Sequence, residues 1–478
     1  MNSARIQAPG PTSRSLAAGS ARSYSRLRTL SANSLVVAVL SPFLALTVGY
    51  GPKVLLAIVI LDIPFQFGTH LFYREREAAF GALGGLSISA TTIALACLYL
   101  SWFIRSQANR NTEASPGLHI NLPLLLYLAI TAISVVVAED VSLSLFEVFL
   151  LLESCLVYFY VANNVRTRQD VLFVVSVLMI ACLAESLAMI ALRFNAMPST
   201  IWGTHVHVDT DVKEGFTRIG GTVGSPNSAA AYLSISVASA ASLLFTKLGR
   251  AYKWLAIAVM GFGGVALIFT FSRGGWVALA LPVTFISLVG WRRSGLSLRT
   301  PIVAILILGM LYLPFHSVIS ARLLGDDRGS AESRIPLMKL AFRIIKDNPV
   351  LGVGANNFTV VMGRYLTPEF RNGFLFAVHN KYLLVLSETG IVGLLGFLAF
   401  LLDALLKGWR CWKFQDRFLS PLALGIVAGI GGHMVHMSVD VFRGRPIQQL
   451  LWLLAGLLAA MHRMCRPHSS EDSLPYIT

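Results

Sequence analysis

The sequence has few charged residues, and acidic ones are especially scarce. Only 13% of its 478 residues are Asp, Glu, Lys or Arg, whereas 55% are hydrophobic. The interior of a soluble domain would be saturated well below that hydrophobic fraction, so a soluble globular protein is excluded. Apolar runs long enough to cross about 30 Å of hydrocarbon recur along the whole chain. The sequence therefore predicts an all-α, polytopic integral membrane protein.

Cysteines and repeats are also scarce. No two of the five cysteines form a CxxC pair, so neither a disulfide framework nor a thiolate metal site is indicated. No internal repeat marks an inverted-repeat transporter. The stretch His205-x-His207-x-Asp209-x-Asp211 could bind a divalent ion, but a solvated loop is the favoured interpretation. We expect no metal and no cofactor.

The 39 basic residues outnumber the 24 acidic ones, and their placement argues against a nucleic acid partner. Arginines fill the N-terminal tail, and other basic clusters fall in short connections such as 407–417. This is the positive-inside pattern, which orients helices and contacts anionic lipid. We expect cytoplasmic tails at 1–32, which should be disordered, and at 466–478. No small-residue cleavage site closely follows the first apolar run, so a signal peptide is not expected.

Thirteen apolar runs between polar breaks are candidate membrane spans. The first two are separated only by Gly51-Pro52 and are counted as one net crossing, which gives about twelve transmembrane helices. The runs group into membrane segments at 33–118, 119–316 and 380–465. The candidate spans are 33–50, 52–69, 80–104, 119–138, 143–162, 171–193, 227–247, 253–271, 275–291, 300–316, 380–406, 420–439 and 446–462.

This topology leaves two extracytoplasmic loops, at 194–226 and 317–379. The larger loop carries eight Lys/Arg and five Asp/Glu, an excess that suggests an anionic ligand. Within it, Ser333-Arg334-Ile335-Pro336 predicts the start of a helix that must end before Asn348-Pro349. That helix is amphipathic, and it should lie along the membrane surface or cover a cavity. Its apolar face comprises Leu337, Leu340, Ala341, Ile344 and Ile345.

Three polar residues, His379, Asn380 and Lys381, stand at the start of the apolar run from 380. On a helix, Asn380 and Lys381 would turn toward the polar boundary. A histidine here can accept a proton near neutral pH and suits general-base catalysis; the alternative is an interfacial histidine with a structural hydrogen bond. Lys381 could simply anchor the helix. One stripe would contain His379, Leu383, Leu386, Gly390 and Gly393, whose glycines let a helix or a lipid chain approach.

Three arginines on separate segments are candidate phosphate ligands. Arg273, in TFSRGGW, could bind a phosphate bidentately with help from backbone N–H groups, or could be a snorkelling interfacial residue. Arg218 precedes GGTVGSPN, in which Asn227 could cap a helix. Arg334 opposes the dipole of the loop helix that it opens, so it should have a partner. Together with His379 they predict a site for an anionic pyrophosphate.

Asp440 shares a helix face with His433 and His436. An acid within the membrane is a functional candidate by default, and pairing with Arg443 or Arg445 is the structural alternative.

Four motifs occur in one order: Arg218 with GGTVGSPN, FSRGGW, SRIPLMKLAFRIIKDNPVLGVGANNF and HNKYLLVLSETGIVG. In these motifs the chain resembles the O-antigen ligase and O-antigen polymerase superfamily of bacterial envelope glycosyltransferases. The last motif fits the family pattern of His-Asn, nine residues, Gly, two residues, Gly. The resemblance covers roughly 119–465, and residues 1–118 add only generic membrane helices.

The resemblance implies a type-C (GT-C) glycosyltransferase of the bacterial inner membrane. It would move glycan from a polyprenyl (undecaprenyl) diphosphate carrier to a hydroxyl of a saccharide acceptor at the periplasmic face. It implies His379 as the base, and Arg218, Arg273 and Arg334 as the diphosphate clamp, with Arg273 also catalytic. The displacement would be direct, inverting and independent of metal. Further candidate substrate-binding residues are Asn227, Asn380, Lys381 and Asp440, and envelope-assembly proteins are possible partners.

The branches of the superfamily are not separated by these motifs. The acceptor could be a lipid A-core sugar (a ligase), another lipid-linked repeat (a polymerase) or a protein Ser/Thr (a protein O-oligosaccharyltransferase). Polymerase or exopolysaccharide assembly is slightly favoured because nothing marks a groove for a protein acceptor. A transporter of a small anion or solute is the alternative class, but it predicts polar groups near the bilayer midplane. A non-catalytic scaffold would leave the Arg/His set unexplained.

Overall fold

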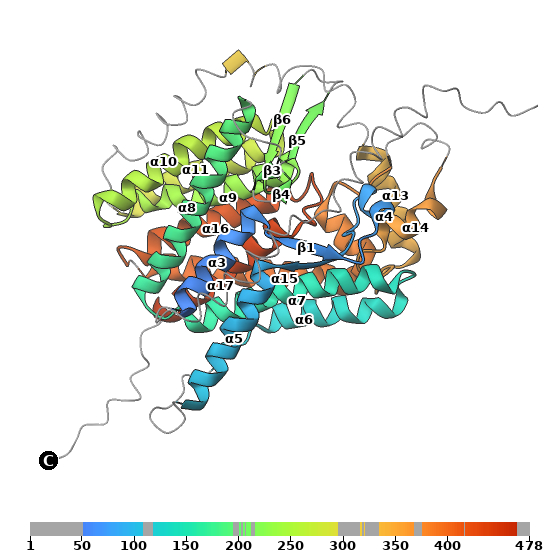
Figure 1. The fold of residues 1–478 in the computed structure, drawn as a ribbon, viewed down its shortest axis with the longest axis horizontal. Helices are drawn as coiled ribbons and strands as arrows, with labels where there is room; N and C mark the ends of the chain where they lie inside the picture. The colour runs from blue at the N-terminus through green and yellow to red at the C-terminus, as the bar shows by residue number, and fades with distance from the viewer. Residues whose placement is uncertain are drawn as a thin grey trace, which may run out of the picture.

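A computed structural model describes residues 51–108, 118–194, 200–201, 204–205, 207–211, 216–294, 316–317, 320, 334–367, 375–414 and 416–465. This part of the chain is mainly helical (Figure 1). The longer helices are α3 (Gly51–Phe65), α5 (Ala90–Ala108), α6 (Leu122–Ile133), α7 (Val141–Asn164), α8 (Arg168–Arg193), α9 (Pro226–Leu243), α10 (Arg250–Phe269), α11 (Arg273–Ser294), α13 (Arg334–Asp347), α15 (Lys381–Lys413), α16 (Leu419–His436) and α17 (Arg445–Cys465). Shorter ones are α4 (Glu75–Ala79), α14 (Phe358–Val361) and the 3₁₀ turns Ser134–Val137 and Met362–Tyr365.

The helices pack side by side in a bundle (Figure 1). One group contains α6, α7, α15 and α17, and another contains α8, α9, α10, α11 and α16. The inner helix α9 is rich in Ala and Ser, which lets its neighbours approach closely. A Cβ at Gly275 would lie 2.5 Å from the Cβ of Ala230, and one at Gly425 would lie 2.3 Å from the Cβ of Ser242. Small side chains therefore set the spacing around α9.

Five helices are long and apolar enough to cross a membrane: α7, α8, α10, α15 and α16. Two shorter apolar helices cover Leu122–Val137 and Arg273–Val289. These helices confirm the predicted helical membrane protein. The candidate spans 33–50 and, except for residue 316, 300–316 lie outside the described residues, as do both tails, so the count of twelve and the domain boundaries stay predictions.

Three antiparallel ribbons show that the expectation of an all-α protein is wrong in detail. They pair β1 (Gly68–Leu71) with β2 (Leu86–Ser89), β3 (Thr200–Ile201) with β4 (Thr204–His205), and β5 (His207–Asp211) with β6 (Phe216–Gly221). The first ribbon interrupts the predicted spans 52–69 and 80–104, so α5 begins only at Ala90. A Cβ at Gly68 would lie 2.5 Å from the Ile88 carbonyl oxygen. Glycine at this position lets the two strands approach closely, and the hydropathy pattern did not indicate these strands.

The predicted loop helix is α13, which begins at Arg334 and ends at Asp347, directly before Asn348-Pro349. Its apolar face is buried as predicted, except that Ile345 is only partly buried. That face packs in one apolar cluster with Phe358, Val378 and Leu384. The predicted apolar face of α13 therefore packs against the protein interior.

Helix α15 is broken at Gly390, where φ is 65° and ψ is −171°. The segment 349–354 enters the break, and its backbone pairs with groups that the break leaves without helical partners. Three hydrogen bonds join the two segments: Ile391 N to Pro349 O (2.9 Å), Val353 N to Ser387 O (3.0 Å) and Gly354 N to Glu388 O (2.9 Å). The Gly-rich turn predicted after the loop helix thus completes α15.

The approach of a helix or lipid chain at Gly390 is a wrong prediction. A Cβ there would lie 1.9 Å from the carbonyl oxygen of Val350, so a loop of the same chain occupies the space. At Gly393 the nearest atom is the Oγ1 of Thr389, at 1.9 Å from such a Cβ, within the same helix. Gly390 therefore serves the break in α15, whereas a Cβ at Gly393 would also lie 3.6 Å from Ile130 Cγ2, so helix α6 does pack beside that glycine.

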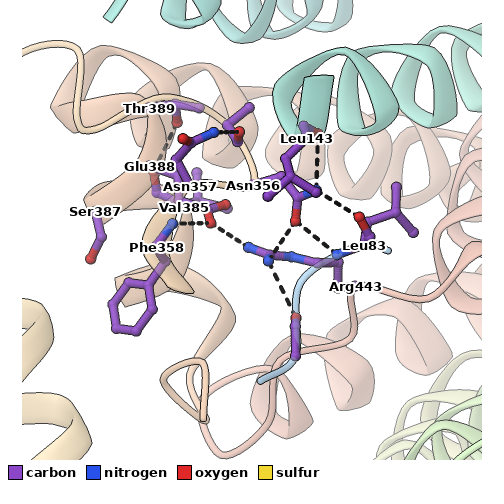
Figure 2. Close-up of polar contacts among 12 residues, drawn as sticks. Leu83, Leu143, Asn356, Asn357, Phe358, Val385, Ser387, Glu388, Thr389 and Arg443 are labelled. Atoms are coloured by element: carbon purple, nitrogen blue, oxygen red, sulfur yellow. Dashed lines mark hydrogen bonds and ion pairs between the residues drawn. The ribbon is translucent and has the colours of Figure 1, made fainter. Parts of the chain in front are cut away.

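A buried ion pair joins the broken helix to the connection between α16 and α17 (Figure 2). The Arg443 guanidinium donates to Glu388 Oε1 (2.5 Å) and to Asn356 Oδ1 (2.9 Å). These three residues, the Arg443 cluster, are at most 6% exposed. Asn356 Nδ2 also donates to the carbonyls of Leu83 and Leu143 (2.9 Å each). The backbone N–H of Phe358 donates to Glu388 Oε1 (3.1 Å). One cluster thus fixes five segments that are distant in sequence.

We expect Gly390→Ala to destabilise the protein by about 2–5 kcal/mol, because it combines a positive φ with a clash against backbone. Gly431→Ala is the matched control, since nothing lies within 4 Å of its added Cβ in α16. Thermal unfolding of the detergent-solubilised protein measures both. Equal midpoints for the two variants would contradict the observed break.

Arg443→Ala should cost about 3–5 kcal/mol, because it leaves the Glu388 carboxylate buried without its cation. Arg364→Ala is the control: that arginine pairs with Glu139, but its side chain is 71% exposed, so the loss should be about 0–1 kcal/mol. The double change Arg443→Met with Glu388→Gln should recover part of the loss. Similar thermal shifts for the two Arg→Ala variants would argue against the structural role of the Arg443 cluster.

Candidate functional site

The predicted site residues approach one another at one end of the bundle, where α15 and α17 begin and α16 ends. We call this the site end. His379 lies there, directly before α15 and partly buried. Its Nδ1 is 3.0 Å from the carbonyl oxygen of Ala377, and its ring packs edge-on against Phe376. Because a carbonyl only accepts, this hydrogen bond assigns the proton of the neutral ring to Nδ1 and leaves the lone pair on Nε2.

The predicted orientation toward the polar boundary is wrong for Lys381. Asn380 caps α15: its Oδ1 accepts from Leu383 N (3.0 Å), and its Nδ2 donates to the Ser438 carbonyl (2.9 Å). Lys381 is only 8% exposed, and its backbone N–H donates to Met437 O (2.8 Å). These bonds tie the start of α15 to the end of α16, and the lysine therefore faces inward.

Lys381 lines a small internal cavity together with Tyr127, His433 and Gln448. The shared stripe predicted for His379 and the glycines is also wrong, because His379 precedes the helix. The sequence could not distinguish these orientations, since the direction of the first turn depends on contacts with α16.

Asp440 is 9% exposed and lies in the connection between α16 and α17. Its Oδ1 accepts from Val441 N (2.7 Å), while its Oδ2 is buried with no hydrogen-bond partner in the described part of the chain. The predicted structural alternative is wrong, because Arg443 pairs with Glu388 and Arg445 pairs with Asp62 (2.6 Å). The carboxylate thus has an unsatisfied oxygen at the site end.

His436 is a residue that the sequence reasoning placed only in a weak cluster. It is 2% exposed, and its Nδ1 has no hydrogen-bond partner among the described residues. A Cβ at Gly274 would lie 2.8 Å from its Nε2, so His436 packs directly against the residue after Arg273. The charges of Asp440 and Arg334 both act on the ring. In the sequence, the two glycines after Arg273 were the feature that could have predicted a closely packed neighbour.

The structure brings Arg218 and Asn227 into contact. From β6, Arg218 donates through Nε to the Thr270 carbonyl (3.0 Å) and through Nη2 to Asn227 Oδ1 (2.8 Å). Thr270 ends α10, three residues before Arg273, which is partly buried at the start of α11. Asn227 is not the predicted cap, because Ser225 caps α9. Its amide instead holds the guanidinium of Arg218.

Arg334 is partly buried at the first residue of α13. Its charge acts on His436, whose ring packs against Gly274, the residue after Arg273. Arg218 on β6 is thus bonded to the turn that leads to Arg273 on α11, and the charge of Arg334 on α13 reaches the end of α16. An arrangement of this kind can bind an anion through several guanidinium groups.

Comparison with known proteins identifies a family. A family model described as O-antigen ligase (Wzy_C) matches residues 258–398. No curated protein matches the chain. One solved structure, from a study titled "Structural coordination of polymerization and crosslinking by a peptidoglycan synthase complex", is 16% identical and matches over 73% of this chain and 99% of that chain, with a TM-score of 0.36. A score this low says nothing about function.

The matched range includes Arg273, Arg334 and His379, and therefore three of the four motifs on which the resemblance rests. The apolar helices add the membrane setting. A match to the O-antigen ligase (Wzy_C) family model over 258–398 therefore agrees with the family that the motifs of this chain predict.

Proposed function

We propose that this protein transfers a glycan from a polyprenyl-diphosphate carrier to a hydroxyl group at the outer face of the bacterial inner membrane. One chain of contacts supports the proposal: His379 directly precedes α15, whose first residue is bonded to Met437 at the end of α16, and His436 of α16 packs against Gly274, the residue after Arg273. The O-antigen ligase domain supports a glycan-transferring enzyme.

In this proposal His379 is the general base. Its Nε2 takes the proton of the acceptor hydroxyl, and the oxygen attacks the anomeric carbon of the donor sugar. The bond from that carbon to the diphosphate breaks with inversion, and the lipid diphosphate leaves with the electron pair. The hydrogen bond to Ala377 fixes the tautomer and the direction of the ring.

The arginines stabilise the leaving group. Arg218, Arg273 and Arg334 would bind the diphosphate oxygens, where planar guanidinium groups make paired hydrogen bonds. Their charge meets the negative charge that grows as the bond breaks, which is the role a metal ion has in many sugar-nucleotide enzymes. The transfer proposed here needs no metal.

The remaining polar residues receive different roles. Asp440 is proposed to accept a hydrogen bond from a sugar hydroxyl, because its Oδ2 is unsatisfied. Asn227 and Asn380 act on substrate indirectly, since their amides hold Arg218 and the start of α15. Lys381 faces the internal cavity, so we no longer assign it to substrate.

A transporter of a small anion is the second candidate, and the broken α15 beside a buried lysine favours it. In transporters the freed backbone groups of such a break bind the ligand. Here the segment 349–354 already satisfies them. We therefore favour the enzyme.

His379→Ala and Arg273→Ala should each reduce glycan transfer at least about 100-fold, because each removes a group used in the transition state. Surface polysaccharide in the source organism is the measurement, with His70→Ala and Arg364→Ala as controls and protein levels matched. Accumulated lipid-linked repeats would indicate a polymerase, and lipid-linked polymer with bare core a ligase. Glycan lost from proteins would indicate protein glycosylation. Normal chain length and attachment in both variants would exclude the enzyme.

Arg218→Lys should lose nearly as much activity as Arg218→Ala, about tenfold or more. A lysine keeps the charge but cannot reach the Thr270 carbonyl and Asn227 at once. The KM for a purified lipid-linked donor is the measurement. An Arg218→Lys variant with the wild-type KM would show that charge alone suffices.

A further inference from the structure

Glu185 is a fully buried acid of α8 that has no part in the proposed chemistry. Other buried acids, such as Asp62 and Glu388, are paired with arginine. Glu185 forms no ion pair within the described residues. Its carboxyl group contacts Thr222 instead: Oε1 accepts from the backbone N–H (2.8 Å), and Oε2 is hydrogen-bonded to the hydroxyl.

Thr222 belongs to the turn 222–224, which follows β6. The turn is held from two sides, because Gln66 Nε2 also donates to the carbonyls of Thr222 (2.7 Å) and Val223 (2.9 Å). At Gly221, φ is 62° and a Cβ would lie 2.0 Å from Glu185 Oε1. The GGTVG motif thus fits its backbone directly against the acid of α8.

Hydrogen-bond counting indicates which form of Glu185 is present. The Thr222 hydroxyl has one proton but contacts two oxygens, Glu185 Oε2 and the carbonyl oxygen of Pro64 (2.9 Å). The Pro64 carbonyl can only accept. Both contacts are satisfied when the hydroxyl donates to Pro64 and a protonated Glu185 donates to the hydroxyl. Burial without a cation favours the same neutral form.

We propose that Glu185, as a neutral carboxylic acid, is a positioning residue for Arg218. The turn that it holds joins Arg218 on β6 to Asn227 on α9, and these two side chains are hydrogen-bonded (2.8 Å). A shift of the turn would move both partners and the contact of Arg218 with Thr270. This inference rests on the proposed role of Arg218 in binding the donor diphosphate.

The test compares Glu185→Gln and Glu185→Leu in the purified full-length protein. The glutamine oxygen can accept from Thr222 N–H and its amide can donate to the hydroxyl, so the donor KM should stay within about threefold of wild type. The leucine makes neither bond, and the donor KM should rise about tenfold. Ser186→Ala should change nothing, because this buried neighbour donates within α8, to the carbonyl of Cys182.

Two measurements separate positioning from general damage. Thermal unfolding midpoints identify variants that lose activity because they unfold. Thr222→Val removes only the hydroxyl that bonds to Glu185 and should also raise the donor KM. A double-mutant cycle tests the coupling: Glu185→Leu should add little to Arg218→Ala, because both act through the same guanidinium.

If Glu185→Gln raises the donor KM as much as Glu185→Leu does, at equal thermal stability, the proposal that Glu185 is a neutral acid is overturned. An unchanged donor KM in a folded Glu185→Leu variant would overturn positioning. If Arg218→Ala itself transfers glycan normally, the proposed role of Arg218 fails. Positioning is then decided by cryo-electron microscopy: the Arg218 contacts with Thr270 and Asn227 should be lost with leucine and kept with glutamine, and their persistence with leucine would refute it.

Discussion

The buried ion pair between Arg443 and Glu388 holds together the segments that form the site end. Glu388 lies just before the break in α15, and Arg443 lies between α16 and α17. Asn356, which binds the same guanidinium, follows the segment that fills the break. His379 lies nine residues before Glu388, and Asp440 lies three residues before Arg443. Their relative positions therefore depend on a charge pair that cannot lose one partner cheaply.

The break in α15 also matches the helix to the membrane. A straight helix of 33 residues would be about 50 Å long, well beyond about 30 Å of hydrocarbon. The part after Gly390 is about 35 Å long and can span the membrane alone. The preceding part is then available to present His379 beyond the hydrocarbon. Filling the break with backbone from 349–354 satisfies its polar groups without a ligand, which separates this arrangement from that of a transporter.

Local signals in the sequence predicted local structure well. Proline in the first turn and Asn348-Pro349 gave the bounds of α13, and the spacing of its leucines gave the buried face. The order of the four motifs predicted the family that the comparison then matched. Ion pairs between residues distant in sequence were not predictable. Arg443 pairs with Glu388 and Arg445 pairs with Asp62, although Asp440 is nearer in sequence to both. The inward turn of Lys381 and the contact of His436 with Gly274 likewise depend on how α16 packs.

The partners of the buried charges distinguish structural from functional groups. Asp62 and Glu388 each have an arginine, and Glu185 is satisfied by a threonine. Asp440 has neither, and its Oδ2 stays unsatisfied within the described residues. A buried oxygen of this kind is costly unless a ligand supplies the missing hydrogen bond. His436, on which the charge of Asp440 acts, likewise has an Nδ1 without a hydrogen-bond partner in the described part of the chain, so unsatisfied polar atoms gather where α16 ends.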